Sequence, residues 1–185
     1  GTDTEESVFE HREWQPPGGP ATQLASSSAT PCSNNNPERS AFFGDLHIHT
    51  SYSLDAFNRG GFQNPDDAYR FAKGESVLHP SGFDIKIWGE PLDFVAATDH
   101  GAYMGILPAM HDPNNPLSKL DMSKEMFGTD PELITNAFGK IGGAVRSGVP
   151  YEEIYDRAII DSAWKQAIDT ANEYYVPGKL TTFAA

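Results

Sequence analysis

The chain has a single cysteine, Cys32, among 185 residues, and it has no long apolar run. One cysteine excludes a disulfide within the chain and a zinc site built from several cysteines. Because no stretch approaches the roughly 18 apolar residues of a membrane span, the sequence predicts no transmembrane helix. Neither a Gly-rich phosphate loop nor a Gly-x-Ser-x-Gly elbow occurs, so two common nucleotide and hydrolase signatures are missing.

Basic residues are also scarce. The chain carries 13 Lys and Arg against 26 Asp and Glu, a formal net charge of −13. Such a charge repels phosphate backbones and anionic lipid surfaces, so we expect no nucleic-acid partner. It is compatible with binding multivalent cations. A phosphorylated substrate would then need a metal ion, or a local basic group, to offset the repulsion.

Composition divides the chain near residue 40. Residues 1–40 are rich in Pro, Gly, Ser and Asn, which predicts an N-terminal arm without a core of its own. We expect this arm to be extended and pinned against the folded part, through Phe9 and Trp14. Residues 41–185 have the apolar periodicity of a folded domain.

Strands and helices are predicted to alternate in this domain. In chain order they are a strand over 41–49, a helix over 64–74, a strand over 92–97, an insertion with short helical pieces over 101–150, a helix over 151–175 and a strand over 179–185. The order β-α-β-α-β is typical of a parallel α/β fold. Three strands cannot close a barrel, and a parallel sheet is normally covered on both faces. We therefore expect the N-terminal portion of a larger fold.

Two histidines mark the end of the first predicted strand. His47 and His49 are separated by one residue, so on a strand their side chains point to the same face. His100 follows the second predicted strand and would join them if the two strands are neighbours. Neutral imidazole is the commonest nitrogen ligand for zinc and also suits iron and manganese. The pattern therefore predicts a metal site at the carboxyl ends of the strands.

Acidic residues accompany these histidines. Asp55 lies in a polar loop six residues after His49 and is a candidate metal ligand. Asp45 and Asp99 are candidates to accept hydrogen bonds from imidazole N–H groups, which would orient the rings. His79, in the segment before the second strand, is a possible pocket residue. No catalytic acid or base is assigned.

These motifs resemble a known family. The runs Asp45-Leu46-His47-Ile48-His49-Thr50, Ser53-x-Asp55 and Thr98-Asp99-His100 are similar to the first two motifs of the PHP (polymerase and histidinol phosphatase) superfamily. The segments Phe43-Gly44-Asp45 and 68–75 resemble a branch of large, poorly characterised bacterial PHP-like proteins. The resemblance covers roughly residues 42–100, together with the strand over 179–185 by its order.

The resemblance implies a distorted (β/α)7 barrel, similar to a TIM barrel, with two or three divalent metal ions such as zinc, manganese or iron. It implies that His47 and His49 bind one metal, and that Asp55 and His100 bind another. The family's bridging carboxylate follows the third strand, which here runs to the last residue. Its later histidines and final Asp-x-His motif have no counterpart in the chain, and the insertion over 101–150 is not general to the superfamily.

The expected function is therefore a metal-dependent hydrolase, with phosphoester hydrolysis favoured by the resemblance. Amide or other ester hydrolysis stays open, because amidohydrolase barrels also begin with His-x-His. A metal-stabilised binding module without turnover is a third alternative. The expected partners are a small-molecule substrate, with a phosphorylated one favoured, and the remainder of the barrel. The polar arm, the absence of an initiator Met and the branch resemblance favour a periplasmic or secreted location.

Overall fold

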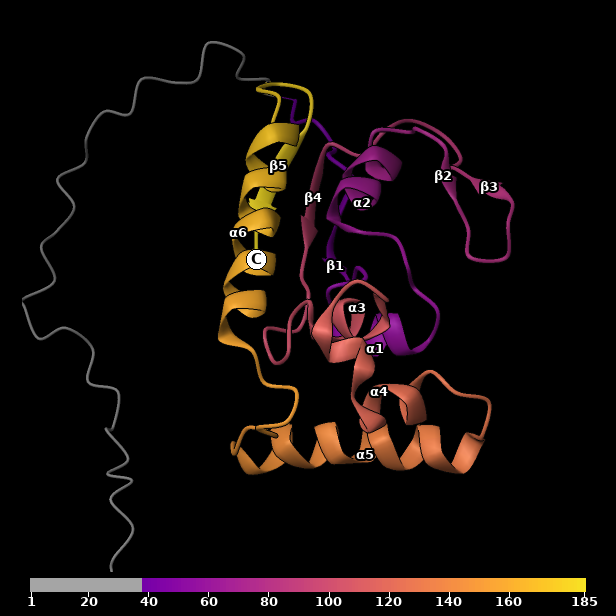
Figure 1. Ribbon diagram of the computed structural model, residues 1–185. Helices are drawn as coiled ribbons and strands as arrows, with labels where there is room; N and C mark the ends of the chain where they lie inside the picture. Colours follow the sequence, from indigo (N-terminus) through magenta and orange to yellow (C-terminus); the bar gives the residue numbers. More distant parts are fainter. Residues whose placement is uncertain (1–37) are drawn as a thin grey trace, which may run out of the picture. The chain divides into compact units, whose positions relative to one another are not determined.

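A parallel three-stranded sheet organises the domain (Figure 1). Its strands are β1 (Gly44–Ile48), β4 (Phe94–Ala97) and β5 (Thr181–Ala184), and β4 lies in the middle. Both strand pairs are parallel, as the alternation of strands and helices in the sequence predicts. The sheet does not close into a barrel within the described part of the chain.

The computed structural model describes residues 38–185, and residues 41–185 form one compact unit. The predicted contacts of Phe9 and Trp14, and nearly all of the predicted arm, lie outside the described residues. None of the described helices is both long enough and apolar enough to cross a membrane.

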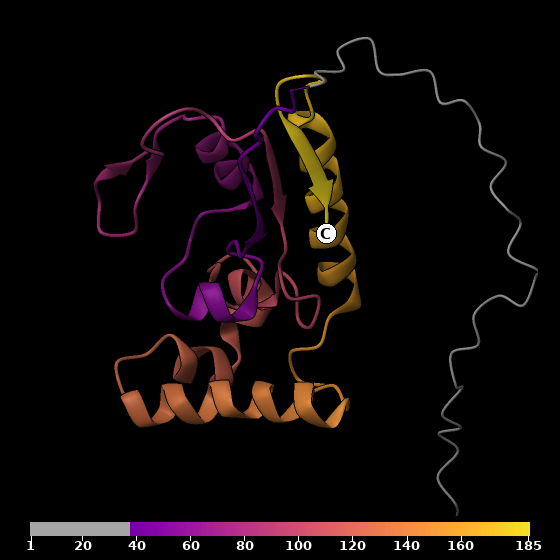
Figure 2. The ribbon, with the colours of Figure 1, turned by 180° about the vertical axis from the view of Figure 1, so that it is seen from behind.

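Two helices cover one face of the sheet. α2 (Pro65–Ala72) and α6 (Arg157–Tyr174) bury a cluster that includes Tyr69, Val95 and Ala171. Val95, Ala96 and Ala97 are all buried although they alternate between the two faces of the sheet, which agrees with the near-continuous apolar sequence of β4. Seen from behind, β5 lies in front of α6, and no described helix covers this second face (Figure 2).

The predicted start of α2 is confirmed in detail. The Asn64 side chain accepts a hydrogen bond from the Asp67 backbone N–H, and the Asp67 carboxylate accepts one from the Asn64 N–H. Pro65 occupies the first helical position, where its missing N–H costs nothing. This reciprocal cap satisfies two N–H groups that the helix itself leaves without partners.

The predicted helix over 151–175 is wrong at its start. α6 begins at Arg157, because Asp156 is extended and its carboxylate accepts hydrogen bonds from the N–H groups of Ala158 and Ile159. Residues 151–154 instead form a turn. Ile154 is fully buried in that turn, so its apolar character reflects packing rather than helical periodicity.

The insertion forms a helical layer with its own core. Its elements, together with the short helix that precedes them, are α1 (Leu54–Asn58), α3 (Ile106–His111), the 3-10 helix η1 (Pro116–Lys119), α4 (Asp121–Met126) and α5 (Pro131–Ser147). Asp130 caps α5 as predicted, but α5 has 17 residues rather than being a short piece. Its three interior glycines lower its helix propensity. Burial of Ala137 and Ile141 in the core of the layer overrides that cost.

A two-stranded antiparallel hairpin, β2 (Val77–Leu78) and β3 (Asp84–Ile85), lies between α2 and β4. This hairpin is not predicted from the sequence, because two-residue strands are too short to show a periodicity. Val77 is buried, and Leu78, next to it, is exposed.

Gly44 gives a test of the strand register. It is the register partner of Phe94, and a Cβ added at Gly44 would lie 2.1 Å from the Phe94 carbonyl oxygen. We expect Gly44→Ala to lower the free energy of unfolding by roughly 2–3 kcal/mol or more, because the pair must separate. Urea denaturation measures this difference.

Gly143→Ala is the matched control. Gly143 lies within α5, and its added Cβ would meet nothing within 4 Å. This variant should gain about 0.5–1 kcal/mol from helix propensity. Equal stability of the two variants would contradict the close β1–β4 register.

Candidate metal centre

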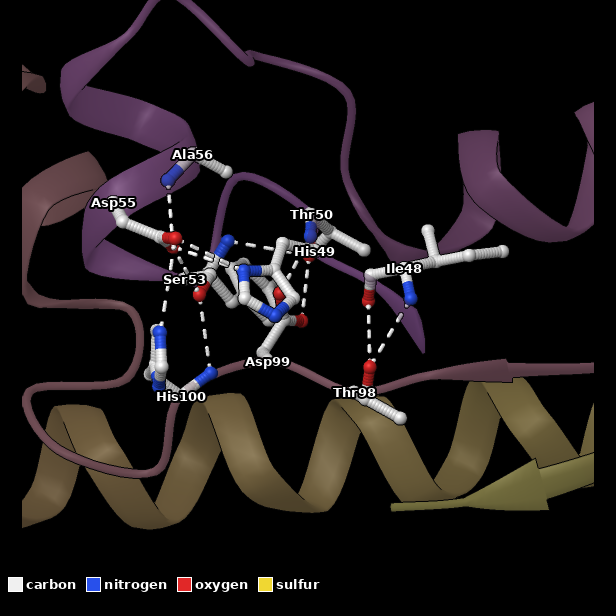
Figure 3. Close-up of polar contacts among 10 residues, drawn as sticks. Ile48, His49, Thr50, Ser53, Asp55, Ala56, Thr98, Asp99 and His100 are labelled. Atoms are coloured by element: carbon white, nitrogen blue, oxygen red, sulfur yellow. Dashed lines mark hydrogen bonds and ion pairs between the residues drawn. The ribbon is translucent and has the colours of Figure 1, made fainter. Parts of the chain in front are cut away.

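The carboxyl ends of β1 and β4 are tied together by hydrogen bonds (Figure 3). The Ile48 carbonyl accepts from the Thr98 backbone N–H at 2.7 Å, and the Ile48 N–H donates to Thr98 Oγ1 at 3.1 Å. One step further, Thr50 donates its backbone N–H and its hydroxyl to the carboxylate of Asp99. The two loops that leave these strands therefore start side by side.

These hydrogen bonds between the two strand ends bring the three predicted histidines together. The rings of His47 and His49 have centroids 5.0 Å apart, as expected for residues two apart on a strand. The rings of His49 and His100 have centroids 4.8 Å apart. The two strands are neighbours, which was the condition for His100 to join the pair, and His100 therefore lies beside His49.

Asp55 lies between His49 and His100. Both of its carboxylate oxygens are 3.1 Å from His49 Nδ1, and its Oδ2 is 3.7 Å from His100 Nε2. It belongs to the first turn of α1, and that short helix turns the carboxylate back over the strand ends. The loop after β1, α1 and the loop after β4 therefore meet at this carboxylate.

The spacing of these donor atoms suits a single cation. One ligand atom from each of His49, Asp55 and His100 lies within 4.8 Å of the others. At metal–ligand distances near 2.1 Å, two ligands of a tetrahedral ion lie about 3.4 Å apart. The His49–Asp55 and His100–Asp55 separations of 3.1 and 3.7 Å bracket that value.

His47 lies beside this three-residue group but is not one of its members. Its side chain is exposed on the rim, whereas His49 is partly buried. The four predicted ligands are therefore together at one edge of the sheet, with His47 on the outer side of His49.

The electrostatics keep Asp55 ionised. Partial burial alone would raise the pKa of Asp55, but hydrogen bonds from Ser53 and His49 outweigh it and hold the pKa below its ordinary value. The nearby imidazole and the Ala56 backbone N–H add to this effect. An ionised carboxylate is the form that binds metal. By contrast, burial raises the pKa of Asp99, against the opposing hydrogen bonds from Thr50.

Asp45 and Asp99 do not play the part predicted for them. Their described hydrogen bonds go to the main chain or to a hydroxyl: Asp45 accepts from the His47 backbone N–H at 2.8 Å, and Asp99 accepts from Thr50. Neither carboxylate accepts from an imidazole among the described hydrogen bonds. They fix the backbone that carries the histidines, because they accept from local backbone N–H groups and from the Thr50 hydroxyl.

His79 lies away from the group. It is in the turn of the β2–β3 hairpin, where its ring stacks on Phe83 at 4.6 Å and its Nδ1 accepts from the Ser81 N–H. A cavity of about 170 Å³ is lined by His49 together with Val77 and Ile85 of the same hairpin. His79 is not part of that lining. The structure therefore does not bring His79 to the predicted pocket.

Ser53 has a role in the site that is not predicted from the sequence. It is fully buried, its hydroxyl donates to Asp55 Oδ1 at 2.8 Å, and its oxygen accepts from the His100 N–H at 3.1 Å. One hydroxyl thus orients the carboxylate and fixes the backbone of the facing histidine. Ser53 lies two residues before Asp55, a spacing from which its hydrogen bond to Asp55 could have been predicted. Its contact with His100 joins residues 47 positions apart, which no local pattern indicates.

Comparison with known proteins gives a family without an assigned function. A family model described as "Protein of unknown function (DUF3604)" matches residues 36–185, so the chain belongs to this family. No curated protein and no solved structure matches the chain.

Ser53→Ala tests the orientation of Asp55. Loss of the hydroxyl should raise the pKa of Asp55, because the largest of the hydrogen bonds that lower it is removed. The His100 N–H would also lose its acceptor in a partly buried hydrogen bond, which should cost about 1 kcal/mol of stability. Carboxyl NMR titration measures the first effect and urea denaturation the second.

Ser81→Ala, at an exposed serine in the β2–β3 hairpin, is the control and should change neither quantity. An unaltered Asp55 pKa in Ser53→Ala would show that the hydroxyl does not orient the carboxylate.

Proposed function

We propose that this DUF3604 protein is a metal-dependent hydrolase whose ions are held by His47, His49, Asp55 and His100. The observation that carries the proposal is the convergence of His49, Asp55 and His100 from separate segments, with ligand atoms within 4.8 Å of one another. A second observation supports it, since the ring of His47 lies 5.0 Å from that of His49. Two or three ions of zinc, manganese or iron are the proposed cofactors.

A plain His–Asp ion pair is the competing interpretation of this cluster. Such a pair needs one imidazole, whereas three imidazole rings lie next to one another here. Their centroids are 5.0 Å apart for His47 and His49 and 4.8 Å apart for His49 and His100. Neutral imidazoles with one carboxylate form a donor set typical of zinc, iron and manganese.

A bound divalent ion supplies two things to a hydrolase: it lowers the pKa of water, and it polarises a phosphoryl or carbonyl oxygen. The residues of the chain prepare for this chemistry. Asp55 is kept ionised, Ser53 fixes the direction of its carboxylate, and Asp45 and Asp99 hold the main chain beside the histidines. The donors therefore sit on backbone that is hydrogen-bonded in place, as precise metal sites require.

A phosphoester is the substrate class we favour, on the resemblance to the PHP superfamily. The net charge of −13 makes this substrate depend on the bound cations, because the chain as a whole repels anions. A periplasmic or secreted location is part of the same proposal.

The sheet itself supports a larger barrel. Leu46 and Phe183 on the outer strands are 54% and 46% exposed, and Phe43, just before β1, is 70% exposed. The outer edges of β1 and β5 pair with no other strand in the described residues. Further strands would cover these side chains and satisfy these edges, and they would bring additional ligands to the same rim.

Metal content is the direct test of the site. Protein purified without chelators should contain two or more equivalents of zinc, manganese or iron by elemental analysis. His49→Ala and His100→Ala should each lose most of this metal, because each removes a donor from the cluster. His79→Ala is the control, since His79 stacks on Phe83 away from the cluster, and it should keep the wild-type content.

Metal near zero in the folded wild-type protein would overturn the proposal. Metal that survives both His49→Ala and His100→Ala would show that it is held elsewhere.

Asp55→Asn tests turnover separately. The amide keeps the size of the side chain but removes its charge, so hydrolysis of a phosphomonoester such as 4-nitrophenyl phosphate should fall by at least roughly a hundredfold, the scale of losing one electrostatic group in an active site. Steady-state assays with added Mn²⁺ or Zn²⁺ measure it. Bound metal with no hydrolysis of phosphoesters, esters or amides would identify a binding module instead.

A further inference from the structure

A second cavity begins one residue after His100. Its volume is about 480 Å³, and it lies between the segment 101–104, the end of α5 and the first part of α6. Consecutive Cα atoms are 3.8 Å apart, so the cavity wall at Gly101 is next to a candidate metal ligand. Substrate pockets of enzymes typically have volumes of about 300–1,000 Å³, and this cavity falls within that range.

Aromatic and aliphatic side chains form most of the lining. The larger ones are Tyr103, Met104, Val145, Tyr155, Ile160 and Trp164. Trp164 is 43% exposed and Tyr155 is 37% exposed, although both are large and apolar. Aromatic side chains that line an open cavity offer a flat apolar surface on which a ring can stack.

The charges in the lining cancel. Arg157 and Asp161 both line the cavity, and their side chains pair with each other at 2.7 Å. An occupant therefore meets no unpaired charge from these two residues, which favours a neutral group over an ion.

One residue of the lining, Tyr103, has an unusual backbone conformation. Tyr103 has a φ of 57°, in the left-handed region that bulky residues rarely adopt. Its hydroxyl accepts a hydrogen bond from the Tyr151 N–H at 2.7 Å, and its ring meets that of Tyr155 edge to face. Strained backbone of this kind persists where the surroundings fix it, and it is frequent at ligand sites.

We infer that this cavity binds a neutral, apolar ring, and that the ring belongs to the substrate hydrolysed at the neighbouring His49–Asp55–His100 cluster. The assignment of the ring to a substrate rests on the proposed function, whereas ring binding itself does not. The favoured substrate is then an aryl ester, preferably an aryl phosphoester, whose leaving group occupies the cavity. The helical insertion thus contributes the part of the site that selects the substrate.

Calorimetric titration with two probes tests this inference. 2-Naphthol supplies the neutral ring alone, and methylphosphonate supplies the anionic group alone. We expect the protein to bind 2-naphthol, and Trp164→Ala to weaken this binding by roughly tenfold through loss of ring stacking. Trp164→Phe should retain most of it, because a ring remains.

Trp88→Ala is the matched control, because Trp88 is fully exposed and does not line the cavity. It should bind 2-naphthol as the wild type does, and circular dichroism should show that each variant is folded. Absence of 2-naphthol binding, or equal binding by Trp164→Ala and Trp88→Ala, would overturn the inference.

His49→Ala separates this inference from the proposed function. It should abolish methylphosphonate binding and leave 2-naphthol binding unchanged. If the protein binds no metal and no methylphosphonate but still binds 2-naphthol at Trp164, the hydrolase proposal fails and the ring site stands. If metal binds and 2-naphthol does not, the reverse holds.

Discussion

The hydrogen-bonded join between the ends of β1 and β4 is the constraint on which the candidate site depends. Thr98 pairs with Ile48 through both its main chain and its hydroxyl, and Asp99 receives both donors of Thr50. Parallel strands send their carboxyl ends to the same edge, so this join fixes where the two following loops begin. Without it, nothing would bring together His49 and His100, which are 51 positions apart in the sequence.

Above this join, the site is organised around one carboxylate. Asp55 is shared by His49, His100 and Ser53, and all of them come from segments that leave the sheet edge. Its lowered pKa follows from the hydrogen bonds that converge on it. Because this arrangement is set by hydrogen bonds within the protein, the donors are already positioned for the proposed metal ion, which would reduce the cost of assembling the site.

The helical layer of the insertion gives the site its surroundings. Its core packs Ile106, Met110 and Ile141, and α5 ends beside the cavity that follows His100. The sheet edge and the helical layer therefore contribute different parts of the candidate site. The sheet positions the polar donors, and the layer supplies apolar and aromatic surface next to them.

The sequence by itself determined the three strands of the parallel sheet, the capped start of α2, the parallel order and the histidine pair, because these follow from local periodicity and capping chemistry. It also indicated that His100 follows the carboxyl end of β4. Only the tertiary structure decided the start of α6, the length of α5, the position of His79 and the role of Ser53. Each of these depends on contacts between distant segments, such as Ser53 with the His100 backbone or Tyr103 with Tyr151. Side-chain partners across such separations are set by packing, which local sequence does not encode.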